Sequence, residues 1–270
     1  MSAVASPTLR RRPSPWHLLD YWLITLRRTW RSAAITALVM PALFIGAFGL
    51  VLGDLVDARS GPASLEGASS YLLFVGPGLL ASQVMLNVFS EATWPVKGMV
   101  VWQRSYVAMA ATPLRVRDIV VAHLAAIAAK TALVSAGSVV VLRLGGAVDS
   151  WGSAALLVPV QVLLALAFAG VVHAVTVATL SDAVITLLWR IVSTPLFLFS
   201  GAFFPIANLP GALEVAARLT PLWHGVDLSR TIALGTADTR GVVVHLAFLA
   251  VWAVAGAVLA VRALDRRLVR

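Results

Sequence analysis

The chain consists largely of long apolar blocks, each about the length of a membrane-spanning helix, separated by shorter polar or basic stretches. An α-helix rises 1.5 Å per residue, so about 20 residues cross the roughly 30 Å of hydrocarbon in a bilayer. Charged residues make up only 12% of the 270 residues, roughly half their share in a soluble domain. We therefore predict an all-α integral membrane protein. Its six transmembrane helices are expected at about 33–53, 70–90, 118–142, 152–177, 183–203 and 241–261.

The N-terminal part divides into two segments. Residues 1–14 are polar and Pro-rich, which predicts a disordered cytoplasmic tail. Residues 15–31 place apolar and charged positions on opposite faces at helical spacing, and Pro15 suits a first turn. Its Trp and Arg residues favour an amphipathic helix in the membrane interface; the alternative is a soluble helix packed on a partner. Residues 32–262 would form the transmembrane domain and 263–270 a basic cytoplasmic tail.

The distribution of basic residues predicts the orientation. Of the 21 Lys and Arg residues, 14 lie on segments that share a side with the N-terminus and 5 on the opposite segments. The other two, Lys130 and Arg190, lie inside spans. Because cytoplasmic loops carry the excess of Lys and Arg, both termini are expected in the cytoplasm. Abundant Arg, Ala, Gly and Val indicate a GC-rich bacterial genome, so we expect a multi-pass protein of the bacterial inner membrane.

Several kinds of chemistry are excluded by the sequence. There is no Cys, which excludes thiolate metal sites and a Cys nucleophile, and the five His show no metal-ligand spacing. No phosphate loop of the form Gly-x-x-x-x-Gly-Lys-[Ser/Thr] occurs. The net charge of +9 comes from residues at span ends, which does not predict nucleic-acid binding. We expect no catalytic or metal site, and energy for transport would have to come from another chain.

The polar segment 91–117 is the first candidate functional region. Residues 101–111 can form a short helix, which should end at Thr112-Pro113 because the residue before Pro is disfavoured in the helical conformation. A cytoplasmic helix between two spans would let a cytosolic partner push on both, whereas the alternative is a plain connecting loop. Glu91, at the inner end of the second span, could hold a helix N–H or a basic residue, or act as a solvated cap.

The second candidate region is 196–231. It is too apolar for a free extracellular loop and too often interrupted by Pro for a span. We interpret it as a re-entrant hairpin in the outer leaflet, which is tolerated only where protein buries the backbone or water lines it. The alternative is a compact surface loop.

Ionisable residues within or beside the spans are further candidates. A charge at the position of Lys130 costs about 2.5–3.5 kcal/mol on insertion scales, so it should face a cavity or a partner. The functional interpretation is that it lines the export path or the interface of a dimer. The alternative is a Lys that snorkels or is held by backbone carbonyls. Arg190 is expected to snorkel inward, or to meet an anionic headgroup or Glu91. His224 and Asp227 are three residues apart, so on a helix they could face the same side and act together as a catalytic base at the outer interface.

Five short motifs occur in order along the chain: Glu91-Ala92-Thr93, Ala111-Thr112-Pro113-Leu114, Phe199-Ser200-Gly201-x-Phe203-Phe204-Pro205, Leu209-Pro210 and Pro221-Leu222-x-His224. Their order and spacing resemble ABC-2-type exporter permeases, most closely the nodulation-factor (lipo-oligosaccharide) exporters and the daunorubicin-type drug exporters. The resemblance covers nearly the whole chain. At Trp94-Pro95-Val96 the chain departs from the nodulation-type pattern, just before the coupling helix that the resemblance implies.

The resemblance implies a fold like that of type V ABC exporters. Residues 15–31 correspond to the connecting helix, 98–111 to the coupling helix that docks on an ATPase, and 204–231 to re-entrant helices that close the outer gate. The implied coupling residues are Glu91, Trp102, Arg104, Tyr106, Thr112, Pro113 and Leu114. The implied gate residues are Phe199, Gly201, Phe203, Phe204, Pro205, Leu209, Pro210, Pro221 and His224. The implied partners are a separate ABC ATPase in two copies, which binds ATP and Mg, a second permease (identical or paralogous) and membrane lipid.

Our main hypothesis is therefore a permease subunit of an ATP-driven exporter. Its substrate would be amphipathic, such as a lipid-linked saccharide, a glycolipid or a polyketide-like drug, taken from the cytoplasm or inner leaflet. One alternative is a polytopic membrane enzyme that acts on lipid at the outer interface through His224 and Asp227. Another is a membrane anchor that transports nothing.

Overall fold

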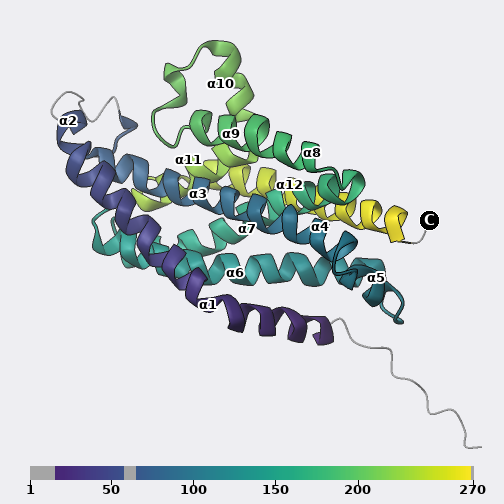
Figure 1. The fold of residues 1–270 in the computed structure, drawn as a ribbon. Helices are drawn as coiled ribbons and strands as arrows, with labels where there is room; N and C mark the ends of the chain where they lie inside the picture. The colour runs from purple at the N-terminus through teal and green to yellow at the C-terminus, as the bar shows by residue number, and fades with distance from the viewer. Residues whose placement is uncertain (1–15, 58–64, 269–270) are drawn as a thin grey trace, which may run out of the picture.

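The computed structural model describes residues 16–57 and 65–268, and these form a bundle of helices with no strand among them (Figure 1). The helices in chain order are α1 (Trp16–Phe44), η1 (Ile45–Val51), α2 (Gly53–Asp57), α3 (Tyr71–Ala92), α4 (Trp94–Val101), α5 (Ser105–Ala110), α6 (Val116–Leu144), α7 (Trp151–Thr179), α8 (Asp182–Leu187), η3 (Leu188–Ser193), α9 (Thr194–Phe199), η4 (Ile206–Asn208), α10 (Gly211–Arg218), α11 (Pro221–Ala233) and α12 (Thr239–Leu268). The predicted tail 1–14 lies outside the described residues.

Six helical stretches are long and apolar enough to cross a membrane, which confirms the predicted all-α membrane fold. They are Ile24–Gly49, Tyr71–Val101, Val116–Leu144, Trp151–Thr179, Asp182–Phe199 and Thr239–Leu268. Side-chain hydroxyls cap the starts of α3, α7 and α11. The hydroxyls of Ser70, Ser150 and Thr220 accept hydrogen bonds from the backbone N–H groups of Leu73, Ser153 and Trp223, respectively. The start of α1, the short helix α5 and the end of α12 lie at one end of the bundle (Figure 1).

The first helix differs from its prediction. An interfacial helix at 15–31 and a separate span at 33–53 were expected, but α1 runs without a break through Arg31 and Ser32, and the π-helical η1 follows. No Gly or Pro interrupts the chain there, so nothing ends the helix. Instead α1 changes direction along its length (Figure 1). The hydroxyls of Thr25, Thr29, Ser32 and Thr36 bond to carbonyls three or four residues earlier. Such bonds often bend helices.

The predicted coupling helix 98–111 is wrong in its bounds. Residues 98–101 belong to α4, which continues the second span past a break at Thr93, with Pro95 in its first turn. A turn over 102–104 then separates α4 from α5, and Arg104 has a φ of 52°. The residues Trp102-Gln103-Arg104 therefore form a turn between α4 and α5, which we call the elbow. The second span consequently runs from Tyr71 to Val101, which is about eight and a half turns of helix.

Two further boundaries need correction. The fifth span ends at Phe199, not at 203, and it contains the π-helical turns of η3. The predicted basic tail 263–270 is helical as far as Leu268, because α12 continues beyond its apolar stretch. Leu264 is fully buried against the core there, which explains why the helix does not stop at the first arginine.

The core lies around α3, α6, α7 and α11. The apolar windows of α3, α7 and α6 are 72%, 56% and 50% buried, whereas those of α1, α8–α9 and α12 are at most 17% buried. Helix α12 packs along α7, where Gly170 of α7 meets the backbone of Gly256. Small residues allow two membrane helices to approach this closely.

This close approach gives a first prediction. A Cβ at Gly170 would overlap the backbone of α12, which cannot move as a side chain can. We therefore expect Gly170→Ala to lower the free energy of unfolding by about 1–3 kcal/mol, the usual cost of overpacking. The measurement is unfolding in detergent. Gly152→Ala, in the same helix, is the control, because its Cβ would have no neighbour nearer than 3.7 Å. Equal losses for the two variants would contradict the prediction.

Candidate functional site

The elbow at 102–104 presents an exposed aromatic and basic surface. Trp102 is 65% exposed, and Gln103 and Arg104 are exposed beside it. Thr112 and Pro113, which follow α5, are also exposed, and Leu114 packs against the core. The structure therefore gathers all the predicted coupling residues except Glu91 around the elbow and α5. It places Glu91 elsewhere, in a cavity described below.

Tyr106 anchors the short helix α5 to the spans. It is fully buried, and its hydroxyl is hydrogen-bonded to Nδ1 of His123 on α6 and lies 3.4 Å from Nε2 of His173 on α7. Burial raises the pKa of the Tyr106 phenol, so it stays protonated. Trp22 of α1 stacks on His123 with ring centroids 4.5 Å apart. Tyr106 therefore links α5 to α6 and α7, and the stacking of Trp22 on His123 extends these contacts to α1.

An ion pair missed by the sequence reasoning ties the elbow to the fifth span. Lys97 on α4 pairs with Asp182, the first residue of α8. Its ammonium also lies 5.7 Å from the Trp94 ring and 5.9 Å from the Trp102 ring, within cation–π range. A lone Lys inside the apolar stretch 94–101 was the available signal. Its partner lies 85 residues away, and one sequence does not identify it.

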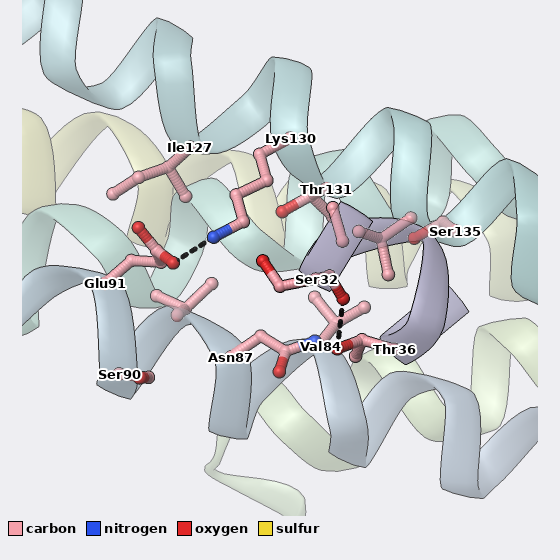
Figure 2. Close-up of a pocket in the computed structure, with 13 residues that line it drawn as sticks. Ser32, Thr36, Val84, Asn87, Ser90, Glu91, Ile127, Lys130, Thr131 and Ser135 are labelled. Carbon is pink, nitrogen blue, oxygen red and sulfur yellow. Dashed lines mark hydrogen bonds and ion pairs between the residues drawn. The ribbon is translucent and has the colours of Figure 1, made fainter. Parts of the chain in front are cut away.

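Glu91 and Lys130 form an ion pair at the edge of a cavity of about 200 Å³ (Figure 2). The cavity lies between α1, α3 and α6, and the side chains of Glu91 and Lys130 point toward each other from α3 and α6. About a third of each side chain is exposed. Lys130 thus faces a cavity and pairs with a carboxylate, and its place on a transport path stays a prediction.

The remaining walls of this cavity are rich in small polar groups. Its polar lining includes Ser32, Thr36, Asn87, Ser90, Thr131 and Ser135. The Ser135 hydroxyl is buried and has no hydrogen-bond partner among the described residues. A buried hydroxyl without a partner is costly, which favours a polar occupant such as water or a hydroxylated group. The arrangement can hold polar groups at membrane depth; it offers no nucleophile paired with a base.

Arg190 does not contact Glu91, so that part of the prediction is wrong. The carboxylate of Glu91 accepts a hydrogen bond from the ammonium of Lys130 instead. Arg190 lies exposed on η3, and no ion pair to it is formed within the described ranges.

Arg230 joins three segments at the other end of the bundle. It is 3% exposed, and its guanidinium donates to Glu66 Oε2 at 2.6 Å, to the carbonyl of Phe74 at 3.1 Å and to that of Gly201 at 2.5 Å. Its guanidinium carbon lies 3.8 Å from the centre of the Phe74 ring. Burial lowers the pKa of Arg230, whereas Glu66 favours its charged form. From the sequence, Arg230 is only one of the basic residues on the predicted outer segments, and its contacts with Glu66, Phe74 and Gly201 are not predictable from their positions in the chain.

The predicted gate residues fall into a buried group and an exposed group. Gly201, Pro205, Pro221 and His224 are buried, whereas Phe199, Pro210 and much of α10 are exposed. Phe203, Phe204 and Leu209 are partly buried. Gly201 has a φ of 85°, and the carbonyl of Phe203 accepts a 3.1 Å hydrogen bond from the hydroxyl of Tyr71. The predicted hairpin contains the helices α10 and α11, and α11 begins at Pro221. Helix α11 is largely buried, whereas α10 projects from the bundle (Figure 1).

His224 and Asp227 do not form the predicted pair. His245 of α12 lies between them: its Nδ1 is 2.8 Å from Nδ1 of His224, and its Nε2 is 3.0 Å from Asp227 Oδ2. His224 also stacks on Phe248 at 3.8 Å. Burial lowers the pKa of His224 to about 4, with His245 adding to the shift, so the ring is neutral near pH 7. The three groups join α11 to α12, and within the described residues no set of three such ligands could hold a metal.

Comparison with known proteins agrees with this architecture. The family described as ABC-2 type transporter matches residues 16–234. Nodulation protein J of Rhizobium leguminosarum bv. trifolii is 34% identical over 257 residues, which cover 92% of this chain and 94% of that protein. Nodulation protein J of Rhizobium meliloti (strain 1021) is 31% identical over 92% of this chain and 94% of its own length. The inner membrane transport permease YadH of Escherichia coli (strain K12) is 25% identical, covering 81% and 86%.

Proposed function

The chain belongs to the ABC-2 type transporter family, and from this premise we propose that it is the membrane subunit of an ATP-driven exporter. It is a multi-pass membrane transport permease, as its family and six apolar helices show. Membership of this family implies association with an ABC ATPase, and the full sequence contains no phosphate loop of its own. ATP and Mg would therefore be bound by the partner, in two copies.

The observation that carries this proposal is the anchored elbow. Trp102 and Arg104 are exposed for a partner, while Tyr106, a few residues further on, is buried against His123 and His173. A partner that closes on ATP and pushes the elbow would move α6 and α7 together, and Lys97 would carry the motion to α8. The coupling contact is therefore the whole elbow with α5, rather than one helix over 98–111.

A second permease copy would complete the path. The membrane faces of α1, α8–α9 and α12 bury little within one subunit, which leaves broad apolar surfaces for a second copy and for lipid. The second copy would be identical or a paralogue. Lys130 would line the path through its cavity with Glu91, and Arg190 would reach the path only across the interface between copies.

The substrate class we propose is amphipathic, such as a lipid-linked saccharide, a glycolipid or a polyketide-like drug. A hydroxyl-lined cavity at membrane depth supports a polar moiety, and apolar helix faces around it support a lipid-like one. The relatives named nodulation protein J are consistent with a saccharide-bearing lipid, on the resemblance described above. Export would start from the cytoplasm or inner leaflet of the bacterial inner membrane, with both termini cytoplasmic. The buried α11 and the exposed α10 would form the outer gate.

Recovery of an ATPase with the purified permease tests the proposal. We expect the full chain, extracted from its native membrane, to retain an ABC ATPase. The double variant W102A/R104A should weaken this association about tenfold, because exposed Trp and Arg are the residue types that most often dominate interfaces. The matched control is R143A/W151A, an Arg–Trp pair with a separation of 5.7 Å at the far ends of α6 and α7. Recovery of no ATPase, or equal loss in both variants, would refute the proposed contact.

A further inference from the structure

Two neighbouring cavities run along the outer side of α7. The first, of about 490 Å³, is almost wholly apolar and lies between α7, η3–α9, α10 and Trp252 of α12. The second, of about 550 Å³, lies between the end of α7 and the end of α12. Both are lined by Val171 and Val175, so they form one continuous groove. We call this the α7–α12 groove.

One end of the groove is apolar and the other is cationic. Arg262, Arg266 and Arg267 line the second cavity near the end of α12. All three are exposed, and none has an ion-pair partner in the part of the chain that the structure describes. Asp265, the neighbouring carboxylate, lies outside the lining. The groove thus combines a concentrated positive charge with an apolar floor.

We propose that the α7–α12 groove binds an anionic phospholipid, with its phosphate at the three arginines and an acyl chain along Val175 and Val171. Guanidinium groups form strong, often bidentate hydrogen bonds to phosphate. From Arg266 to Trp252 the groove extends about 21 Å along α12, at 1.5 Å per residue. That length exceeds the roughly 15 Å of hydrocarbon in one leaflet, so a chain can lie in it. A free anion would satisfy the arginines but leave the apolar floor empty, which is why the groove fits a lipid better.

The arginines lie at the same end of the bundle as α5 (Figure 1). The lipid would therefore come from the leaflet on the side of the ATPase, and this leaflet assignment rests on the proposed function. The binding chemistry does not rest on it. A lipid bound here would fill the space between α7, α9 and α12. It would not enter the cavity of Glu91 and Lys130, because that cavity shares no lining residue with the α7–α12 groove.

Native mass spectrometry of the full-length protein in detergent, titrated with dioleoyl phosphatidylglycerol or dioleoyl phosphatidylcholine, tests the proposal. We expect the anionic lipid to bind at least about tenfold more tightly, since each basic residue near a headgroup strengthens binding. The triple variant R262Q/R266Q/R267Q should remove this preference. The matched control R27Q/R28Q/R31Q makes the same charge change on exposed positions of α1 and should retain it. Loss of the preference in both triple variants would mean general surface charge and would overturn the site.

A variant in the apolar part distinguishes a lipid from a simple anion. Ala178 is exposed and lines the second cavity, so Ala178→Trp should fill the groove and weaken binding of both lipids severalfold without removing an arginine. Inorganic phosphate at millimolar concentration should not displace the anionic lipid; complete displacement would reveal an anion site and overturn the proposal. A change in oligomeric state with Ala178→Trp, at unchanged lipid affinity, would show that a second copy covers the groove and would likewise overturn it. These outcomes do not depend on recovery of an ATPase, so either proposal can fail alone.

Discussion

Replacing Arg230 by alanine is expected to lower the free energy of unfolding by about 3–5 kcal/mol, the usual cost of removing one partner from a buried ion pair. The change would leave Glu66 without its partner and would remove the donors to the carbonyls of Phe74 and Gly201. It would also open a space against the Phe74 ring. Because these contacts join the segment before α3, the start of α3 and the turn after α9, the whole end of the bundle opposite α5 should loosen.

The measurement is unfolding in detergent, by heat or denaturant, with Arg218→Ala as the matched control. Arg218 forms an i,i+4 pair with Glu214 on exposed α10, and its loss should change stability by no more than about 0.5 kcal/mol. Arg230→Lys should recover only part of the loss, because an ammonium cannot reproduce the three-way fork of a guanidinium. A stability change for Arg230→Ala no larger than that for Arg218→Ala would show that the buried contacts contribute little.

The membrane spans were predictable because their physical cause lies in the local sequence. Each apolar block must cover the hydrocarbon depth, so counting residues locates the span to within a few positions, as at Val116–Leu144 and Trp151–Thr179. The ends were less predictable. Leu264 keeps α12 helical beyond its apolar stretch by packing on the core, and such packing is a tertiary effect that composition does not reveal.

The chain between α4 and α6 is interrupted at two places, and only one of them is predictable from a Pro. Thr112-Pro113 was expected to end the coupling helix, and α5 does end just before it, at Ala110. The more important break is at Arg104, where a left-handed backbone conformation separates α4 from α5. Arginine is not a residue type that signals this conformation, so the sequence contained no warning. The sequence departs from the nodulation-type pattern at Trp94-Pro95-Val96, and this position coincides with the start of α4.

The polar pairings of the site were the least predictable part. Lys130 was expected to face a cavity or a partner because an isolated charge in a membrane is costly, and Glu91 was considered as a partner for a basic residue. The pairing of these two with each other, of Lys97 with Asp182, and of Arg230 with Glu66 depends on which helices pack together. A single sequence specifies the need for a partner but not its identity.

Separating the charges of Glu91 and Lys130 is expected to reduce transport strongly. Lys130→Met leaves the carboxylate of Glu91 without its partner, and Glu91→Gln leaves the ammonium of Lys130 without its partner. An unpaired charge within a span costs about 2.5–3.5 kcal/mol on insertion scales. We expect each single variant to lower ATP-dependent transport by the reconstituted complex at least about tenfold. The swap E91K/K130E keeps an opposite pair between α3 and α6 and should restore most of the stability.

The neutral double variant E91Q/K130M decides whether the pair serves transport or only structure. It removes both charges, so no unpaired charge remains, and its thermal stability should lie close to that of the unchanged protein. If the cavity holds the polar part of the substrate during export, this stable variant should still transport poorly, because the charges that orient the substrate are gone. Thr131→Val serves as a milder test, since it removes one lining hydroxyl and leaves both charges in place. Full transport by E91Q/K130M would assign the ion pair to folding alone and would move the transport path away from this cavity.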